Sequence, residues 1–402
     1  MVKPYTCVTS DIRIKPAPRD PVLSIIIPTF NRPQELGLAV ASIAEQITGG
    51  LEHKVEIIIS DNASNEEHQA TIRSLADRFE SVSYYLNAQN VGPGQVALAP
   101  WRARGRWHWL FGDDDVLMPG GVGGVVDALE RHAPAFLSLN RCVADNDLQN
   151  LLTASKNSLP TTHFETFVDL LKCVGVDQLS FFTSQIYETS PARQTDASHY
   201  VDSQCFYSQI AYYLDSYHNL PSMYLEDVYV IHRWQPDDIK KHSANFYHLA
   251  ATLPPIMAYA RDRRSLEPHL FERISGEKSA STAPSRGVTF VDNILQNIWR
   301  CVSMNLHISD DEWAFLESEA LNWRKGRREE VAQARTAQIS LDRLQAEWAQ
   351  ADAALHSRAP ATGGADALRR LADAQLVGKV STLAASVNAG RRAAAEAGSR
   401  YN

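Results

Sequence analysis

Residues 22–28 read Val-Leu-Ser-Ile-Ile-Ile-Pro, a short apolar run that is rich in β-branched side chains. Such a run is typical of a strand that is buried on both faces of a parallel sheet. Directly after it, Asn31 is predicted to cap a helix that has Pro33 in its first turn, and Gly49 and Gly50 end the helical spacing of apolar residues. The stretch therefore predicts a buried strand followed by a helix.

The same alternation continues through the first half of the chain. A second apolar run, residues 55–60, is followed by Ser64-Asn-Glu-Glu67, a pattern typical of a capping box at a helix start. Further strands are predicted at residues 82–86, 107–111 and 135–139. Strands separated by single helices indicate an α/β fold with a mostly parallel sheet, and such sheets bind ligands beyond the carboxyl ends of their strands.

Composition excludes several classes of protein. Among 402 residues, 39 Lys and Arg stand against 47 Asp and Glu, and the formal net charge of −8 argues against generic nucleic-acid binding. Five cysteines lie far apart without a Cys-x-x-Cys pair, which favours a reducing, cytoplasmic location. No stretch approaches the ~20 apolar residues of a membrane helix, and we expect neither a membrane span nor a signal peptide.

Three consecutive aspartates, Asp113, Asp114 and Asp115, come directly after the predicted strand at residues 107–111 and Gly112. Carboxylates this close raise one another's pKa, so they need a compensating cation. Oxygen ligands of this kind favour Mg²⁺ or Mn²⁺, and such ions commonly bridge carboxylates to a substrate diphosphate. The alternative is an Asp-rich turn that caps a helix starting near Pro119.

Four ordered motifs, Ser24–Arg32, Ile57–Ser64, Asn90–Gly92 and Phe111–Pro119, resemble those of the family 2 glycosyltransferases. The resemblance covers about residues 21–240. It implies a GT-A fold, which is a Rossmann-like nucleotide-diphospho-sugar transferase domain with a mostly parallel sheet. It also implies an inverting transfer of a sugar from a nucleotide-sugar donor (UDP, GDP or dTDP type) to a hydroxyl acceptor.

The resemblance further implies roles for particular residues. Gly112 stands where many members carry the first Asp of an Asp-x-Asp motif, which leaves open which carboxylate contacts the ion. Alignment on the proline after this motif assigns the Mg²⁺ or Mn²⁺ ion to Asp114, with Asp115 as a close companion. The donor nucleotide would be held by Pro28, Thr29, Phe30, Arg32, Asp61 and Asp113.

The acceptor hydroxyl needs a base, which in inverting members is an Asp or Glu in the second half of the domain. We favour Asp202, because it precedes a helix-like run at residues 205–214. It could also be the N-cap of that helix, and the two roles do not exclude each other. Glu226 and Asp227 are the alternatives, and they fall in an alternating segment, residues 223–231, that is predicted to be a strand.

The chain is predicted to divide into an N-terminal tail (1–20), the GT-A domain (21–245), a helical C-terminal domain (246–356) and an Ala-rich tail (357–402) that is helical or partly disordered. The helical part could form a homo-oligomer through a coiled coil, or it could pack on its own catalytic domain. The basic cluster at residues 324–328 is interpreted either as a contact with the anionic surface of the inner membrane or as a solvated helix face.

The sequence supports three hypotheses for function to different degrees. The first is a metal-dependent inverting glycosyltransferase that acts on a glycan or lipid-linked acceptor, in bacterial surface polysaccharide synthesis. The second is a catalytically silent nucleotide-sugar-binding or scaffold protein that acts through its helical half, and it is favoured by Gly112. The third, a nicotinamide enzyme, is disfavoured because the first turn, residues 28–32, contains no glycine.

Overall fold

The computed structural model describes residues 9–13, 20–203, 207–234 and 256–267, together with residues 270, 313 and 335. The predicted C-terminal domain and the Ala-rich tail therefore lie almost wholly outside the described residues, and so does the basic cluster at 324–328. The described residues belong mainly to the α/β part of the chain.

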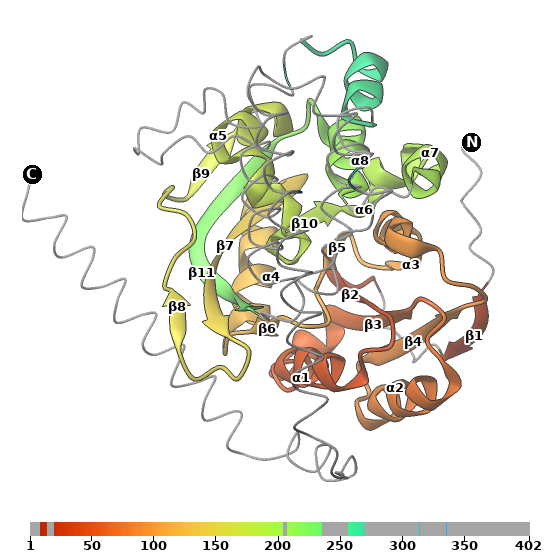
Figure 1. Ribbon diagram of the computed structural model, residues 1–402. Helices are drawn as coiled ribbons and strands as arrows, with labels where there is room; N and C mark the ends of the chain where they lie inside the picture. The colour runs from red at the N-terminus through yellow and green to blue at the C-terminus, as the bar shows by residue number, and fades with distance from the viewer. Residues whose placement is uncertain are drawn as a thin grey trace, which may run out of the picture.

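One mixed sheet runs through the molecule (Figure 1). Two short strands lie off its main path: β8 (Leu151–Thr153) pairs with β7, and β9 (Thr162–Phe164) pairs with β11. The main path consists, in spatial order, of β1 (Thr9–Arg13), β4 (Val82–Asn87), β3 (Val55–Asp61), β2 (Leu23–Thr29), β5 (Trp107–Leu110), β10 (Gln185–Glu188), β7 (Phe136–Asp145), β11 (Ser222–Trp234) and β6 (Val116–Leu117).

The long central strands all point the same way. β4, β3, β2 and β5 form parallel ladders, as do β7 and β11. β10 runs antiparallel between β5 and β7, so these two also share a direction. The predicted α/β fold with a mostly parallel sheet is confirmed, and the inserted antiparallel strand β10 is a feature that the sequence did not predict. The N-terminal stretch predicted as a tail contains β1, which pairs antiparallel with β4.

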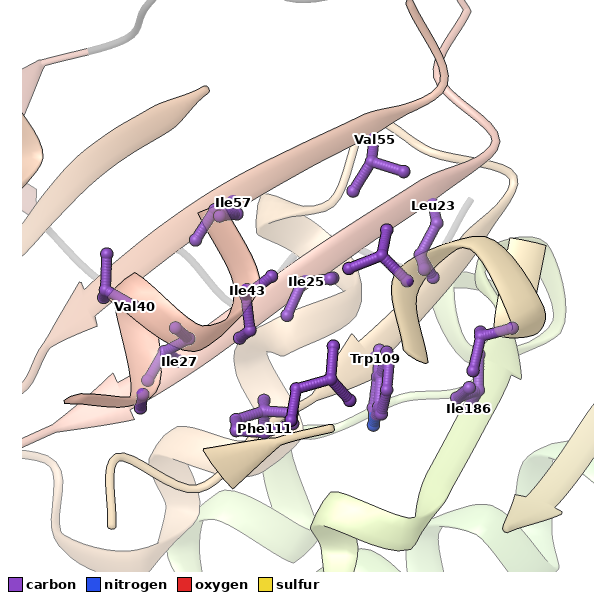
Figure 2. Packing of buried hydrophobic residues seen from close by; sticks show 14 of the residues in the cluster. Leu23, Ile25, Ile27, Val40, Ile43, Val55, Ile57, Trp109, Phe111 and Ile186 are labelled. Atoms are coloured by element: carbon purple, nitrogen blue, oxygen red, sulfur yellow. The ribbon is translucent and has the colours of Figure 1, made fainter. Parts of the chain in front are cut away.

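Helices cover both faces of this sheet, because the side chains of a strand alternate between its two faces. Ile25 and Ile27 of β2 lie in one apolar cluster with Val40 and Ile43, as Figure 2 shows, whereas Ile26 belongs to the cluster on the opposite face. The first cluster involves α1 (Pro33–Ala44), α2 (Glu66–Arg78) and α4 (Gly121–His132). The second involves α5 (Phe167–Ser180), α6 (Thr189–Gln194), α7 (Ser198–Asp202) and α8 (Ser208–Tyr217).

Two predicted helix caps are wrong. Asn31 has a φ of 56°, so it turns the chain in the left-handed region, and the N-cap of α1 is Arg32. The N-cap of α2 is Asn65 rather than Ser64. Instead, Ser64 Oγ accepts a hydrogen bond from the Asn31 amide (2.8 Å), and Asn31 Oδ1 accepts one from the Asn65 amide (2.9 Å). These polar side chains therefore tie together the loops after β2 and β3.

The next described segment after β11 packs against the second face of the sheet. Residues 256–263 are helical, and Ile256 and Met257 are buried in the cluster that contains α8. Asp215 of α8 is fully buried and pairs with Arg263 (3.1 Å) and Arg264 (2.5 Å). At least this part of the C-terminal region is thus held to the α/β domain by apolar burial and a buried carboxylate.

His108 of β5 gives the fold a specific dependence on pH. Its ring is fully buried beside Tyr187, with Nδ1 3.4 Å from Thr189 Oγ1, and burial, aided by Arg193, lowers its pKa to about 3. The unfolded chain takes up a proton here below its ordinary pKa of 6.5, and the folded chain does not. The stability that neutral His108 contributes is therefore lost as the pH falls from 6.5 towards 3.

We predict that His108→Gln removes a pH slope of up to about 1.4 kcal/mol per pH unit from the free energy of unfolding. Urea unfolding at pH 7, 6, 5 and 4 measures this slope. His53→Gln is the matched control, because the His53 side chain is exposed and its replacement should leave the slope as in the wild type. Equal slopes for His108→Gln and the wild type would contradict the prediction.

Candidate functional site

The carboxyl ends of β2, β3 and β5 meet at one edge of the sheet. The parallel register pairs Thr29 with Asp61 and Ile26 with Leu110, so the loops that come after the three strands are neighbours. The Asp triplet begins three residues after Leu110 and therefore lies beside Thr29. This is the edge at which open α/β sheets bind their ligands.

Asp113 is buried and is held from two sides. Thr29 Oγ1 donates to Asp113 Oδ2 (2.8 Å), and Arg32 Nη1 donates to Asp113 Oδ1 (3.0 Å). Burial raises the pKa of Asp113 to about 7; Arg32 opposes this rise and Asp114 adds to it. The predicted donor-binding residues Thr29, Arg32 and Asp113 thus form one hydrogen-bonded group.

Asp114 is the most open of the three aspartates, with a side chain that is 27% exposed. Arg32 Nη2 donates to its Oδ2 (2.9 Å), so the guanidinium bridges Asp113 and Asp114. Arg32 therefore pairs directly with two of the three carboxylates, and the buried Arg233 adds positive charge that acts on Asp114 and Asp115. Arg32 was predicted as a donor-binding residue, and its role as counter-ion was not foreseen.

Asp115 points to a different partner. Thr183, on the 3₁₀ helix η3 (Phe182–Ser184), donates from Oγ1 to Asp115 Oδ2 (2.5 Å) and accepts from the Gly112 amide (3.0 Å). Burial, followed by Asp114, raises the pKa of Asp115 well above its ordinary value, while Thr183, Arg141 and the Arg233 main-chain N–H oppose the rise. Thr183 lies 68 residues away from Asp115 in the chain, and no local motif signalled it.

Gly112 has a packing reason to be glycine. A Cβ atom there would lie 2.6 Å from Asp115 Oδ2 and 3.0 Å from Thr183 Oγ1, so a side chain would collide with the carboxylate. The alternative of a helix-capping Asp-rich turn is wrong, because α4 starts at Gly121 after Gly120 and has no side-chain cap. The triplet is instead fixed by contacts with Thr29, Arg32 and Thr183.

Asp61 is fully buried at the end of β3. Its Oδ1 accepts a hydrogen bond from the Ser64 main-chain N–H (2.9 Å), and its Oδ2 accepts one from the Tyr84 hydroxyl (2.9 Å). Both carboxylate oxygens therefore have hydrogen-bond partners within the protein. The adjacent Asn62, which the sequence did not single out, accepts from the Val91 amide (2.9 Å). The two residues together join the loop after β3 to β4 and to the loop that comes after β4.

Phe30 and Pro28 flank Thr29 at the end of β2. The Phe30 side chain is 42% exposed and is one of two exposed large apolar side chains among the described residues. Pro28 is half-buried within the strand. An exposed aromatic ring next to the carboxylate group is suited to stack on a planar ligand.

The three candidate bases lie on two different elements. Asp202 is exposed and is the last residue of α7, so its interpretation as the N-cap of the next helix is wrong; that N-cap is Tyr207. Glu226 and Asp227 lie in β11, as predicted, where the register against β7 shifts between Leu225 and Val228. Among the described residues, the side chains that donate hydrogen bonds to the Asp triplet are those of Thr29, Arg32 and Thr183. Asp202 makes no such contact with the triplet.

Arg141, Phe181 and His232 form a stack of side chains, and Arg141 acts electrostatically on Asp115. The Arg141 guanidinium is 4.3 Å from the centroid of the Phe181 ring, which stacks on His232 with 4.6 Å between centroids. Arg141 is buried and donates to Gln178 Oε1 (2.9 Å). Its charge acts on Asp115, where it opposes the rise in pKa that burial causes, and the sequence did not predict this role for Arg141.

The part of the chain that the structure describes contains no group of three or more His, Cys, Asp or Glu side chains arranged to hold a metal ion. None of the described helices has the length and hydropathy needed to cross a membrane.

We predict that Gly112→Ala lowers the free energy of unfolding by about 1–3 kcal/mol, because the new methyl group must displace Asp115 or Thr183. Denaturant unfolding measures the loss. Gly123→Ala in α4 is the matched control, since its Cβ would meet nothing within 4 Å. An alanine at this position, in the first turn of α4, should leave the stability unchanged or raise it by up to about 1 kcal/mol. Equal stability of the two variants would show that the Gly112 position has room.

Comparison with known proteins gives a family for this part of the chain. Residues 24–183 match the model of glycosyl transferase family 2. The abequosyltransferase RfbV of Salmonella typhimurium is 32% identical over 118 residues, which are 29% of this chain and 35% of that protein. The GalNAc(5)-diNAcBac-PP-undecaprenol beta-1,3-glucosyltransferase of Campylobacter jejuni is 34% identical over 120 residues, 29% of this chain and 37% of that protein. The matches thus span about a third of these relatives.

Among solved structures, residues 1–349 of S. aureus TarS match with a TM-score of 0.43 and 14% identity, over 80% of this chain and 91% of that one. The family-model match includes β2, β3, β5 and the Asp triplet, which are the elements that build the site. Residues 24–183 are therefore a glycosyl transferase family 2 domain.

Proposed function

We propose that this protein is a metal-dependent, inverting glycosyltransferase that moves a sugar from a nucleotide-sugar donor to a hydroxyl of a glycan or lipid-linked acceptor. The observation that carries the proposal is the Asp113–Asp115 group at the carboxyl end of β5, joined to Thr29 and Arg32 within a family 2 domain. The names of the two relatives support transfer of a sugar. The name of the Campylobacter jejuni protein also includes a PP-undecaprenol group. These names favour an acceptor used in bacterial polysaccharide synthesis. The proposed transfer takes place in the cytoplasm, at the inner membrane.

The donor nucleotide would lie over the ends of β2 and β3. Phe30 would offer its exposed ring to the base, and Pro28 and Asp61, which lie at the ends of these two strands, would lie beneath the nucleotide. The carboxylate of Asp113, held by Thr29 and Arg32, would bind a ribose hydroxyl. A UDP, GDP or dTDP donor would meet these same groups.

Asp114 and Asp115 suit a Mg²⁺ or Mn²⁺ ion in different ways. Asp114 is a partly exposed carboxylate. Among the described residues, its side-chain contact is the one that Arg32 makes with Oδ2, so a hard cation could bind Oδ1. Asp115 accepts a hydrogen bond from Thr183 and would be the companion carboxylate next to the ion. When bound, the ion would supply positive charge to the diphosphate leaving group.

For the base we favour Asp202, whose exposed carboxylate ends α7 shortly before α8. It would accept the proton of the attacking acceptor hydroxyl. Glu226 and Asp227 remain the alternatives, because a local register shift in a strand can redirect side chains toward a site. A catalytically silent protein is less favoured, since Gly112 has a packing reason that does not depend on lost activity.

We predict that Asp114→Asn abolishes the Mn²⁺-dependent part of nucleotide binding, because it removes the charged ligand. Calorimetry with UDP, GDP and dTDP, each with and without Mn²⁺, measures the effect. Asp127→Asn, an exposed carboxylate on α4, is the control and should bind as the wild type does. Unchanged metal dependence in Asp114→Asn would refute the metal assignment.

We predict that Asp202→Asn retains nucleotide binding but lowers sugar transfer about 100- to 10,000-fold, the usual contribution of a general base. Transfer to a lipid-linked acceptor extract, measured with a labelled donor, provides the rate. Glu226→Gln and Asp227→Asn serve as matched variants. Near-normal transfer by Asp202→Asn, with a loss in one of the other two, would reassign the base to β11.

A further inference from the structure

Arg32 divides its guanidinium between two neighbouring carboxylates. Nη1 contacts Asp113 Oδ1 at 3.0 Å and Nη2 contacts Asp114 Oδ2 at 2.9 Å. Arg32 is the N-cap residue of α1, and its side chain is about as exposed as that of Asp114. The fork geometry of a guanidinium suits this double contact, which a lysine ammonium could not reproduce.

The two carboxylates depend on Arg32 to different degrees. Asp113 is also held by Thr29 and is largely buried, so it keeps a partner without Arg32. In the described part of the chain, the side chain that holds Asp114 is that of Arg32. Three adjacent carboxylates repel one another, so the ion-free site needs positive charge. Arg32 supplies part of it through direct ion pairs with Asp113 and Asp114, and the buried Arg233 adds charge that acts on Asp114 and Asp115. The ion pair with Arg32 thereby occupies the more open carboxylate.

We propose that Arg32 competes with the divalent cation for Asp114, holding this carboxylate in the ion-free protein and releasing it when the metal binds. The inference rests on the proposed function, because the competitor is the metal ion proposed there. Arg32 can release Nη2 from Asp114 while Nη1 keeps its contact with Asp113. The consequence is a site that loads metal weakly until an anionic donor also competes for the guanidinium.

The contact at Asp114 is partly exposed and charge-assisted, so its removal should tighten Mn²⁺ binding about five- to tenfold. The probe is Mn²⁺ alone, titrated into the full chain without nucleotide, with free Mn²⁺ measured by electron paramagnetic resonance. Arg32→Gln should show the full gain. Arg32→Lys retains the charge but cannot bridge two carboxylates, and it should show a gain of at least about threefold.

Arg106→Gln is the matched control. Like Arg32→Gln, it removes one positive charge, here from an ion pair with Glu188. Arg106 directly precedes β5 and therefore lies at the end of the strand opposite to the triplet. Its Mn²⁺ affinity should stay within about twofold of the wild type, because exposed charges at that separation are largely screened. Thermal unfolding of each variant checks that the fold is kept.

The titrations separate the competition from the metal assignment. If Asp114→Asn abolishes Mn²⁺ binding but Arg32→Gln binds Mn²⁺ no more tightly than the wild type, the competition is refuted and the metal assignment stands. A gain in Arg32→Gln without any gain in Arg32→Lys would also refute it, because charge alone would then set the affinity. If Asp114→Asn binds Mn²⁺ as the wild type does, the metal assignment of the proposed function fails as well.

Discussion

The parallel pairing of β2 with β3 and with β5 is the constraint on which the rest of this site depends. The register places Thr29 opposite Asp61 and brings the end of β5 alongside, so three loops from distant parts of the sequence converge. The Ile-rich strands hold this register because a shift by one residue would turn the side chains of Ile25 and Ile27 away from α1. Apolar packing on both faces thus determines where the polar residues meet.

Like-charge repulsion is the second constraint, and the chain meets it differently at each aspartate. Asp113 is buried between Thr29 and Arg32, and Asp115 is buried against Thr183. Asp114 lies between them in the sequence, with Arg32 as its counter-ion and with part of its surface open to solvent. The arrangement holds two carboxylates in place and leaves the third accessible to a ligand of positive charge.

Much of this could be predicted from the sequence, because the informative features are local. Apolar runs such as residues 22–28 identified the parallel strands, and the position of Asp113–Asp115 after one of them located the candidate site. The contacts of Thr183 and the insertion of β10 could not be predicted, because they depend on packing between segments far apart in the chain. The cap at Asn31 was wrong because its side chain bonds across to the next loop instead of to its own helix.

The Asp triplet and Arg32 form one group of charges at the sheet edge, and the central claim is that an ion and an arginine alternate at Asp114. A crystal structure with a nucleoside diphosphate and Mn²⁺ tests this most directly. We expect the ion on Asp114, the base against Phe30, and Arg32 in contact with Asp113 but no longer with Asp114. A nucleotide bound elsewhere, or an ion that binds at this edge while Arg32 still bridges both carboxylates, would contradict the claim.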